Sequence, residues 1–189
     1  MKEAALLVMD MQTAMISQLP DADVFTGRVA SAIAAARGAN MPIIYVIIGF
    51  RPGAPEMNLK GKGAAASKGR APWTDDYSKS FLEIHPRVAP QAGDIVVTKR
   101  RVSAFTGSDL EVVLRAQGIK HLVLTGFATS GVVLSTVREA ADKDYQVTVL
   151  ADGCMDRDEE EQRVLMTKIF PRQADVMNIE EWIKGLTDY

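Results

Sequence analysis

The stretch "HLVLTGFATSGVVLST", residues 121–136, contains a pattern of strand, turn and helix that recurs along the chain. Its first six residues are mostly apolar, which is typical of a short strand that is buried on both faces. A turn containing Gly126 and Gly131 follows, and the apolar residues after it recur at helical spacing. A buried strand that leads through a glycine-containing turn into a helix is a basic unit of α/β proteins.

The same alternation runs along the whole chain. Strands are predicted at residues 4–9, 42–49, 94–99, 121–126, 146–151 and 174–179. Helices are predicted at residues 24–37, 108–116, 131–143, 158–170 and 179–186. Strands that alternate with helices indicate a mostly parallel sheet with helices on both faces. We therefore expect a three-layer α/β architecture in a single domain that spans residues 1–189.

Composition excludes several classes of protein. The 189 residues are 47% hydrophobic, enough for one domain with a sizeable core. With a net charge of −2, the chain has no basic excess for binding nucleic acid or an anionic membrane. The longest apolar runs are too short to span a bilayer, and the N-terminus does not resemble a signal peptide. One cysteine, Cys154, excludes an intrachain disulfide, so we expect a soluble cytoplasmic protein.

One segment interrupts the alternation. Residues 49–73 contain five Gly, three Pro and five Lys or Arg against a single Glu. We expect a loop at about residues 49–78, on the side of the sheet where α/β proteins bind ligands. It is either a mobile surface loop or a basic lid that closes over an anionic substrate or completes a subunit contact.

Two residues at predicted strand ends could carry chemistry. Asp10 ends the first strand, where partial desolvation would raise the pKa of its carboxyl group and suit it to proton transfer. Lys99 ends the third strand, and beside Asp10 it would either hold the carboxylate charged or receive its proton, and it would attract an anionic substrate. Arg101 could bind a carboxylate. The alternatives are a loop-anchoring Asp10 and solvated cations at the other two positions.

The turn after residue 126 offers a second kind of site. The first N–H groups of the helix that follows could bind an anion or oxyanion. Thr129 and Ser130 are either nucleophiles or N-caps of this helix. No base is obvious for them. His85 precedes Pro86 in a polar stretch, and His121 starts a strand at the end away from the turn, so a Ser–His–Asp triad is not expected. Cys154 is interpreted as a buried small residue rather than a nucleophile. The two histidines are scattered, and neither a metal nor a cofactor is expected.

Three segments together resemble the isochorismatase-like hydrolases, also called the cysteine hydrolase superfamily. They are "ALLVMDMQ", the run from "GDIVVTKRRVSAFTGSDL" to "LADGCMD", and "FPRQADV", and the resemblance covers nearly the whole chain. It implies a six-stranded parallel sheet and a homodimer or higher oligomer. It also implies that Asp10 and Lys99 are two members of the Asp–Lys–Cys triad. A non-proline cis peptide is implied at Phe127–Ala128, where it helps to turn backbone N–H groups toward the substrate.

The third member of the triad is absent. Amidases of this superfamily read G-x-x-T-[SD]-x-C-V where this chain reads "GFATSGVV", so Val132 stands at the cysteine position. Cys154 lies too far downstream to be a displaced nucleophile, and the metal ligands of nicotinamidases have no match. True isochorismatases carry a glycine there and use the Asp as an acid to cleave a vinyl ether. The resemblance places Phe127, Ala128, Thr129, Gly131 and Val132 around the substrate.

Two hypotheses follow. The first is a small-molecule hydrolase that works without a covalent intermediate, with Asp10 as general acid/base and Lys99 as its partner. Its substrate would be a compact molecule, and the nearby Lys and Arg residues favour an anion. The second is a catalytically inactive relative that binds a small ligand or serves as a structural subunit, since Val132 offers no reactive group. Ser130 or Thr129 as a substitute nucleophile is a third alternative.

Overall fold

The chain forms one six-stranded sheet in which every neighbouring pair of strands is parallel. The computed structural model describes residues 3–58 and 73–186. The strand order is β3-β2-β1-β4-β5-β6, a doubly wound, Rossmann-like arrangement. The strands are β1 (Ala4–Met9), β2 (Ile43–Ile48), β3 (Ile95–Lys99), β4 (His121–Phe127), β5 (Gln146–Met155) and β6 (Asp175–Met177). The prediction of six parallel strands is confirmed, although β5 extends to Met155, four residues beyond its predicted end.

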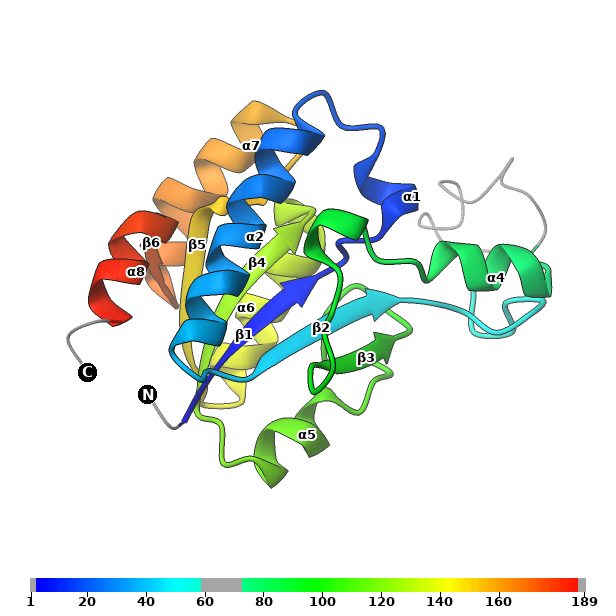
Figure 1. Ribbon diagram of the computed structural model, residues 1–189, viewed down its shortest axis with the longest axis horizontal. Helices are drawn as coiled ribbons and strands as arrows, with labels where there is room; N and C mark the ends of the chain where they lie inside the picture. The colour runs from blue at the N-terminus through cyan, green and yellow to red at the C-terminus, as the bar shows by residue number, and fades with distance from the viewer. Residues whose placement is uncertain (1–2, 59–72, 187–189) are drawn as a thin grey trace.

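Helices cover both faces of this sheet (Figure 1). The α-helices are α1 (Thr13–Ile16), α2 (Ala22–Gly38), α4 (Asp75–Phe81), α5 (Leu110–Ala116), α6 (Leu134–Asp142), α7 (Glu159–Val164) and α8 (Ile179–Leu186). Shorter helical turns are η1 (Pro86–Val88), η2 (Thr129–Val133), η3 (Leu165–Ile169) and η4 (Phe170–Arg172). Helices α2 and α8 lie on one face, and α5 and α6 lie on the other (Figure 1). The three-layer prediction is confirmed.

The core divides into two apolar clusters, one on each face of the sheet. Strand β1 shows why its residues are continuously apolar. Leu6 and Val8 pack with α2 in one cluster, while Leu7 and Met9 pack with α6 in the other. Successive side chains of a strand point to opposite faces, so a strand covered on both sides must be apolar at every position. In the part of the chain that the structure describes, no helix has the length and apolar character needed to cross a membrane.

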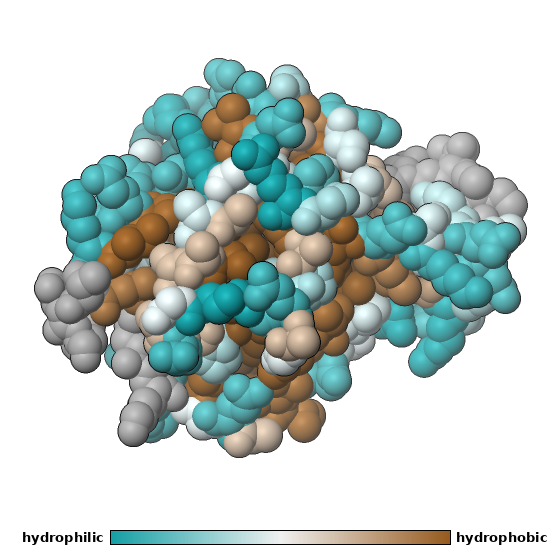
Figure 2. Space-filling model, viewed as in Figure 1, coloured by the Kyte–Doolittle hydropathy of each residue, from teal (hydrophilic) through white to brown (hydrophobic). Residues whose placement is uncertain are grey.

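The outer face of α2 and α8 is mixed, with hydrophobic residues near its centre and hydrophilic ones mainly toward its rim (Figure 2). Among the described residues, Val96 of the edge strand β3 is a large apolar side chain with 46% exposure. Such scattered exposure is ordinary for a folded chain and needs no separate explanation.

The predicted loop at residues 49–78 is shorter than expected where the structure describes it. Helix α4 already begins at Asp75, because the Thr74 hydroxyl accepts the Tyr77 N–H at 3.2 Å and Asp75 favours the first turn. Phe50 and Trp73, which belong to the two described segments 3–58 and 73–186, make an edge-to-face contact with ring centroids 5.0 Å apart. Residues 59–72 lie outside the described residues, so the lid hypothesis for them stays a prediction.

A close approach of two backbones positions the site. Gly126 in β4 faces Met9 in β1, and a Cβ atom on Gly126 would lie 2.2 Å from the Met9 carbonyl oxygen. Gly126 also has a φ of +142°, which side chains rarely allow. Glycine is therefore required here, and it holds the turn after β4 next to Asp10.

Candidate active site

The structure brings Asp10 and Lys99 together at the carboxyl edge of the sheet. Asp10 follows β1 and Lys99 ends β3, and β2 lies between these strands. Adjacent strands lie about 4.8 Å apart, so β1 and β3 are separated by two such distances. The long lysine side chain reaches across the end of β2. The Lys99 Nζ atom lies 3.0 Å from Asp10 Oδ2, and the two side chains are 1% and 6% exposed. This is a buried ion pair.

Burial dominates the electrostatics of Asp10. Desolvation raises the pKa of its carboxyl group from 3.8 to about 6, although the positive charge of Lys99 acts in the opposite direction. Its second oxygen, Oδ1, is buried and has no hydrogen-bond partner among the described residues. One oxygen is thus held by Lys99, while the other is buried and keeps its lone pairs unbonded. A carboxyl group with a pKa near neutrality is suited to acid/base catalysis.

Lys99 has a second acceptor in the backbone. Its Nζ donates to the Arg101 carbonyl oxygen at 2.9 Å. The Arg101 side chain is exposed, and its guanidinium donates to the carbonyl of Arg100 at 2.7 Å. Arg101 therefore contributes its carbonyl group to the buried pair. A substrate-binding role for its guanidinium stays a prediction.

The turn after β4 differs from the predicted helix start. The cis peptide at Phe127–Ala128 is present, as the resemblance implies. The chain then forms the π-helical turn Thr129–Val133 before α6 begins, whereas the sequence predicted a regular helix from Gly131. The Ser130 N–H donates to Asp156 Oδ2 at 2.5 Å, and the Gly131 N–H donates to the Ala128 carbonyl at 3.1 Å. These two N–H groups are already bonded, so they are not free to bind an anion.

The side chains of this turn offer little chemistry. Val132 is 2% exposed and belongs to the apolar cluster that includes Met9. Thr129 is fully buried, and its hydroxyl has no partner among the described residues. The Cys154 thiol is buried 3.7 Å from the Leu124 carbonyl, and burial raises its pKa to about 12. That thiol is unreactive at neutral pH.

The two histidines lie at different ends of the sheet, and His85 is near the carboxyl edge, where its backbone N–H donates to the Met11 carbonyl at 2.9 Å. His121 begins β4 at the amino edge, where its Nε2 lies 2.8 Å from the Thr148 hydroxyl. The His85 ring accepts the Arg87 N–H at 3.3 Å at the start of η1. Neither can serve as a base for Ser130. Across residues 3–58 and 73–186, no cluster of three or more His, Cys, Asp or Glu side chains could hold a metal ion.

A cavity of about 640 Å³ opens beside the cis peptide, and we call it the front chamber. Its lining residues are Ala14, Met15, Gln18, Tyr77, Phe81, Phe127, Ala128, Asp156 and Arg157. The Arg157 guanidinium lies over the Phe127 ring, with Cζ 5.5 Å from the ring centroid. Asp10 and Lys99 do not line this chamber, as expected from their burial. Phe127 and Ala128 are the two predicted substrate-binding residues that do.

Sequence reasoning missed seven of the nine residues that line the front chamber, among them its two charged residues and two of its aromatic ones. Asp156 and Arg157 follow directly after β5, so the rule that ligands bind at strand ends would have found them had the strand been extended to Met155. Tyr77 and Phe81 lie on α4, in and after the predicted loop, and no pattern in the sequence indicated their role.

Comparisons with known proteins agree on one family. Residues 4–181 match the isochorismatase domain. The chain is 34% identical over 215 residues to the ureidoacrylate amidohydrolase RutB of Variovorax paradoxus, covering 99% of this chain and 80% of that protein. An isochorismatase family protein from Burkholderia thailandensis has a similar structure, with a TM-score of 0.87, 29% identity and coverage of 99% and 97%. The N-carbamoylsarcosine amidase of Thermoplasma acidophilum has a TM-score of 0.77, 27% identity and coverage of 94% and 97%.

Proposed function

Because the chain belongs to the isochorismatase-like hydrolase superfamily, we propose that it is a small-molecule hydrolase that works without a covalent intermediate. The observation that carries this proposal is the buried Asp10–Lys99 pair, in which Asp10 has a pKa of about 6 and a free oxygen. Val132 stands where the amidases of the superfamily have their cysteine, so the chemistry must come from this pair and from water.

Asp10 acts as the general acid/base in the proposed reaction. Above pH 6 it is mainly a carboxylate and takes a proton from a water molecule. The oxygen of that water forms the new bond to the electrophilic carbon of the substrate. The bond to the leaving group breaks, and Asp10 returns the proton to it. Lys99 keeps the carboxylate oriented throughout and offsets part of its charge.

The front chamber favours a planar, anionic substrate. Tyr77, Phe81 and Phe127 supply aromatic surface, and Arg157 is a cation without an ion-pair partner among the described residues. Guanidinium groups bind carboxylates in a planar, two-pronged geometry. The ureidoacrylate named for the RutB relatives has both features. Ureides and amides of small unsaturated acids are therefore the first compounds to test.

The test is a substrate screen with two matched variants. Wild-type protein is assayed against ureides, amides, imides and vinyl ethers, and each hydrolysed compound is then assayed with Asp10→Asn. We expect kcat/KM to fall about 10²- to 10⁴-fold, the usual contribution of a general acid/base. Asp94→Asn is the control, because Asp94 also forms an ion pair, a partly buried one with Arg37, but lies before β3 at the opposite edge of the sheet. Equal turnover by wild type and Asp10→Asn would contradict the proposal.

A second candidate function is ligand binding without turnover. The buried Val132 side chain favours it, because it gives the site no nucleophile. Native mass spectrometry of the purified protein would identify a retained small molecule, and the same compound would then be incubated with fresh protein. Recovery of the compound unchanged supports a binding protein, whereas its rapid hydrolysis refutes this candidate.

A further inference from the structure

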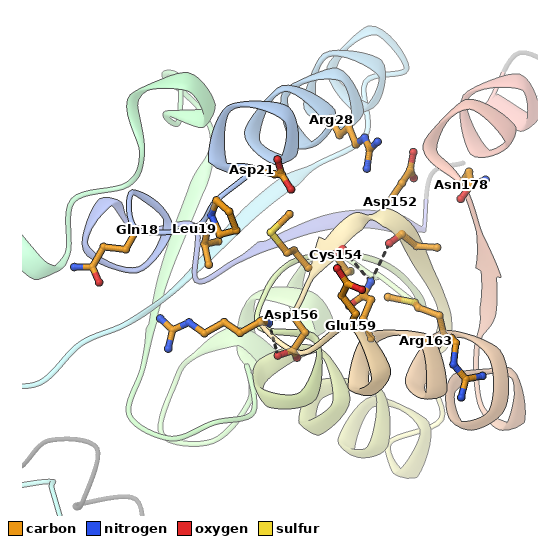
Figure 3. A pocket seen from close by; sticks show the side chains of 16 residues that line it. Gln18, Leu19, Asp21, Arg28, Asp152, Cys154, Asp156, Glu159, Arg163 and Asn178 are labelled. Atoms are coloured by element: carbon orange, nitrogen blue, oxygen red, sulfur yellow. Dashed lines mark hydrogen bonds between the residues drawn. The ribbon is translucent and has the colours of Figure 1, made fainter.

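A second cavity lies next to the front chamber. It has a volume of about 630 Å³ and lies between α2 and α7, beyond the carboxyl end of β5 (Figure 3). We call it the rear chamber. Leu19, Cys154 and Met166 give it an apolar lining. Charged side chains surround this lining, among them Asp21 at the start of α2, Arg28 within α2 and Glu159 at the start of α7 (Figure 3). Both volumes are in the range of cavities that hold small ligands.

The two chambers share part of their lining. Gln18, Asp156 and Arg157 line both of them. Asp156 is held firmly, because its two carboxylate oxygens accept the N–H groups of Ser130 and Arg157. The two chambers therefore adjoin at these three residues, and a ligand bound beside the cis peptide lies close to the rear chamber.

The lining of the rear chamber defines what it accepts. Leu19, Cys154 and Met166 are each less than 10% exposed, and the Cys154 thiol is un-ionised. Charged side chains of both signs also line the chamber, Asp21, Asp152, Asp156 and Glu159 against Arg28, Arg157 and Arg163, so charge alone does not favour an anionic arm. An uncharged, apolar group gains most from burial against such a surface.

We propose that the rear chamber binds an uncharged apolar arm of the substrate, so that the natural substrate is an elongated carboxylate rather than a compact one. This inference rests on the proposed function, because the arm belongs to the proposed substrate, whose carboxylate binds in the front chamber. The test measures binding and not turnover. The binding of an apolar arm can therefore be disproved while the proposed hydrolase activity stands, and the activity can be disproved while the binding stands.

The test uses straight-chain carboxylates from acetate to decanoate as probes, with affinities measured by calorimetry. Burial of each added methylene should raise the affinity about fourfold until the chamber is filled. Glu159→Cys labelled with N-phenylmaleimide blocks the chamber, since Glu159 is exposed and lines it. Labelling is specific because Cys154 is buried. Glu161→Cys with the same label is the matched control, because Glu161 is exposed on the same helix and does not line the chamber.

The label at position 159 should abolish the dependence on chain length and leave the affinity for acetate unchanged. The label at position 161 should leave both unchanged. Ala151→Leu, which fills the chamber from β5, should give the same result as the label at position 159. Equal affinities for all chain lengths in the wild type would overturn the inference, as would identical slopes in all variants. A change in oligomeric state on labelling position 159 would also overturn it, because a second copy would then cover the chamber.

Discussion

Among single residues, Asp10 should determine how kcat/KM depends on pH. Burial places that pKa at about 6, and the carboxylate form acts as the base. We therefore expect kcat/KM to rise about tenfold per pH unit below pH 6 and to level off above it. The measurement is a pH–rate profile of the best substrate from the screen. A profile that falls with rising pH through 6 would mean that Asp10 donates the proton instead, and one without a limb near 6 would exclude Asp10 from the chemistry.

Val132 permits a test of how much of the superfamily's machinery remains. Val132→Cys would place a thiol in the turn beside the Asp10–Lys99 pair. If the pair and the turn can still activate a nucleophile, the pKa of this thiol should lie below the value of about 8.5 for a free cysteine. Alkylation by iodoacetamide as a function of pH measures it. The wild-type protein is the control, since burial raises the Cys154 pKa to about 12. A midpoint near 8.5 would show that the activating geometry is lost.

At the scale of the element, Asp156 fixes the shape of the turn Thr129–Val133. Its carboxylate accepts the Ser130 N–H, a bond that joins the end of β5 to the segment after the cis peptide. Asp156→Ala leaves this N–H without its partner, and the free energy of unfolding should fall by about 1–3 kcal/mol in urea titrations. Because Asp156 and Ala128, the residue before the turn, both line the front chamber, kcat should fall as well.

A control separates stability from activity in this prediction. Asp158 also accepts backbone N–H groups, those of Glu160 and Glu161 at 2.9 Å, as the N-cap of α7. Asp158→Ala should therefore cost about 1 kcal/mol of stability without lowering kcat. Asp156→Asn keeps an acceptor oxygen and should recover much of the lost activity. Equal kcat in the Asp156→Ala and Asp158→Ala variants would reduce Asp156 to a purely structural role.

The elements also show which features the sequence could predict. Six strands were found because each is a short apolar run covered on both faces, and Asp10 and Lys99 followed from their places at strand ends. The π-helical turn was missed, because Thr129–Val133 has ordinary helical spacing and its shape depends on a long-range bond from Asp156. The front chamber was missed for a similar reason. Tyr77 and Arg157 are distant in the chain, and the fold alone brings them to one cavity.

At the scale of the whole molecule, the buried Asp10 should make global stability depend on pH. Its pKa is about 6 in the folded chain against 3.8 for the ordinary carboxyl group, so between these values the folded state binds more protons than the unfolded state. Stability contributed by this group is therefore greatest below pH 3.8 and is lost as the pH rises to 6. A difference of about 2.2 units at 1.36 kcal/mol per unit corresponds to about 3 kcal/mol.

Other groups act in the opposite direction over the same range, so a comparison is needed. Asp94 has a lowered pKa because Arg37 hydrogen-bonds to it, and stability from Asp94 is lost as the pH falls. The reference is the double variant Asp10→Asn/Lys99→Met, which leaves no unpaired charge in the core. The unfolding free energy of wild type minus that of the double variant should fall by about 3 kcal/mol between pH 3.5 and pH 6.5, as measured by urea titration at each pH. A difference that is constant with pH would mean that Asp10 has an ordinary pKa, and Asp10 would then lack the property on which the proposed chemistry depends.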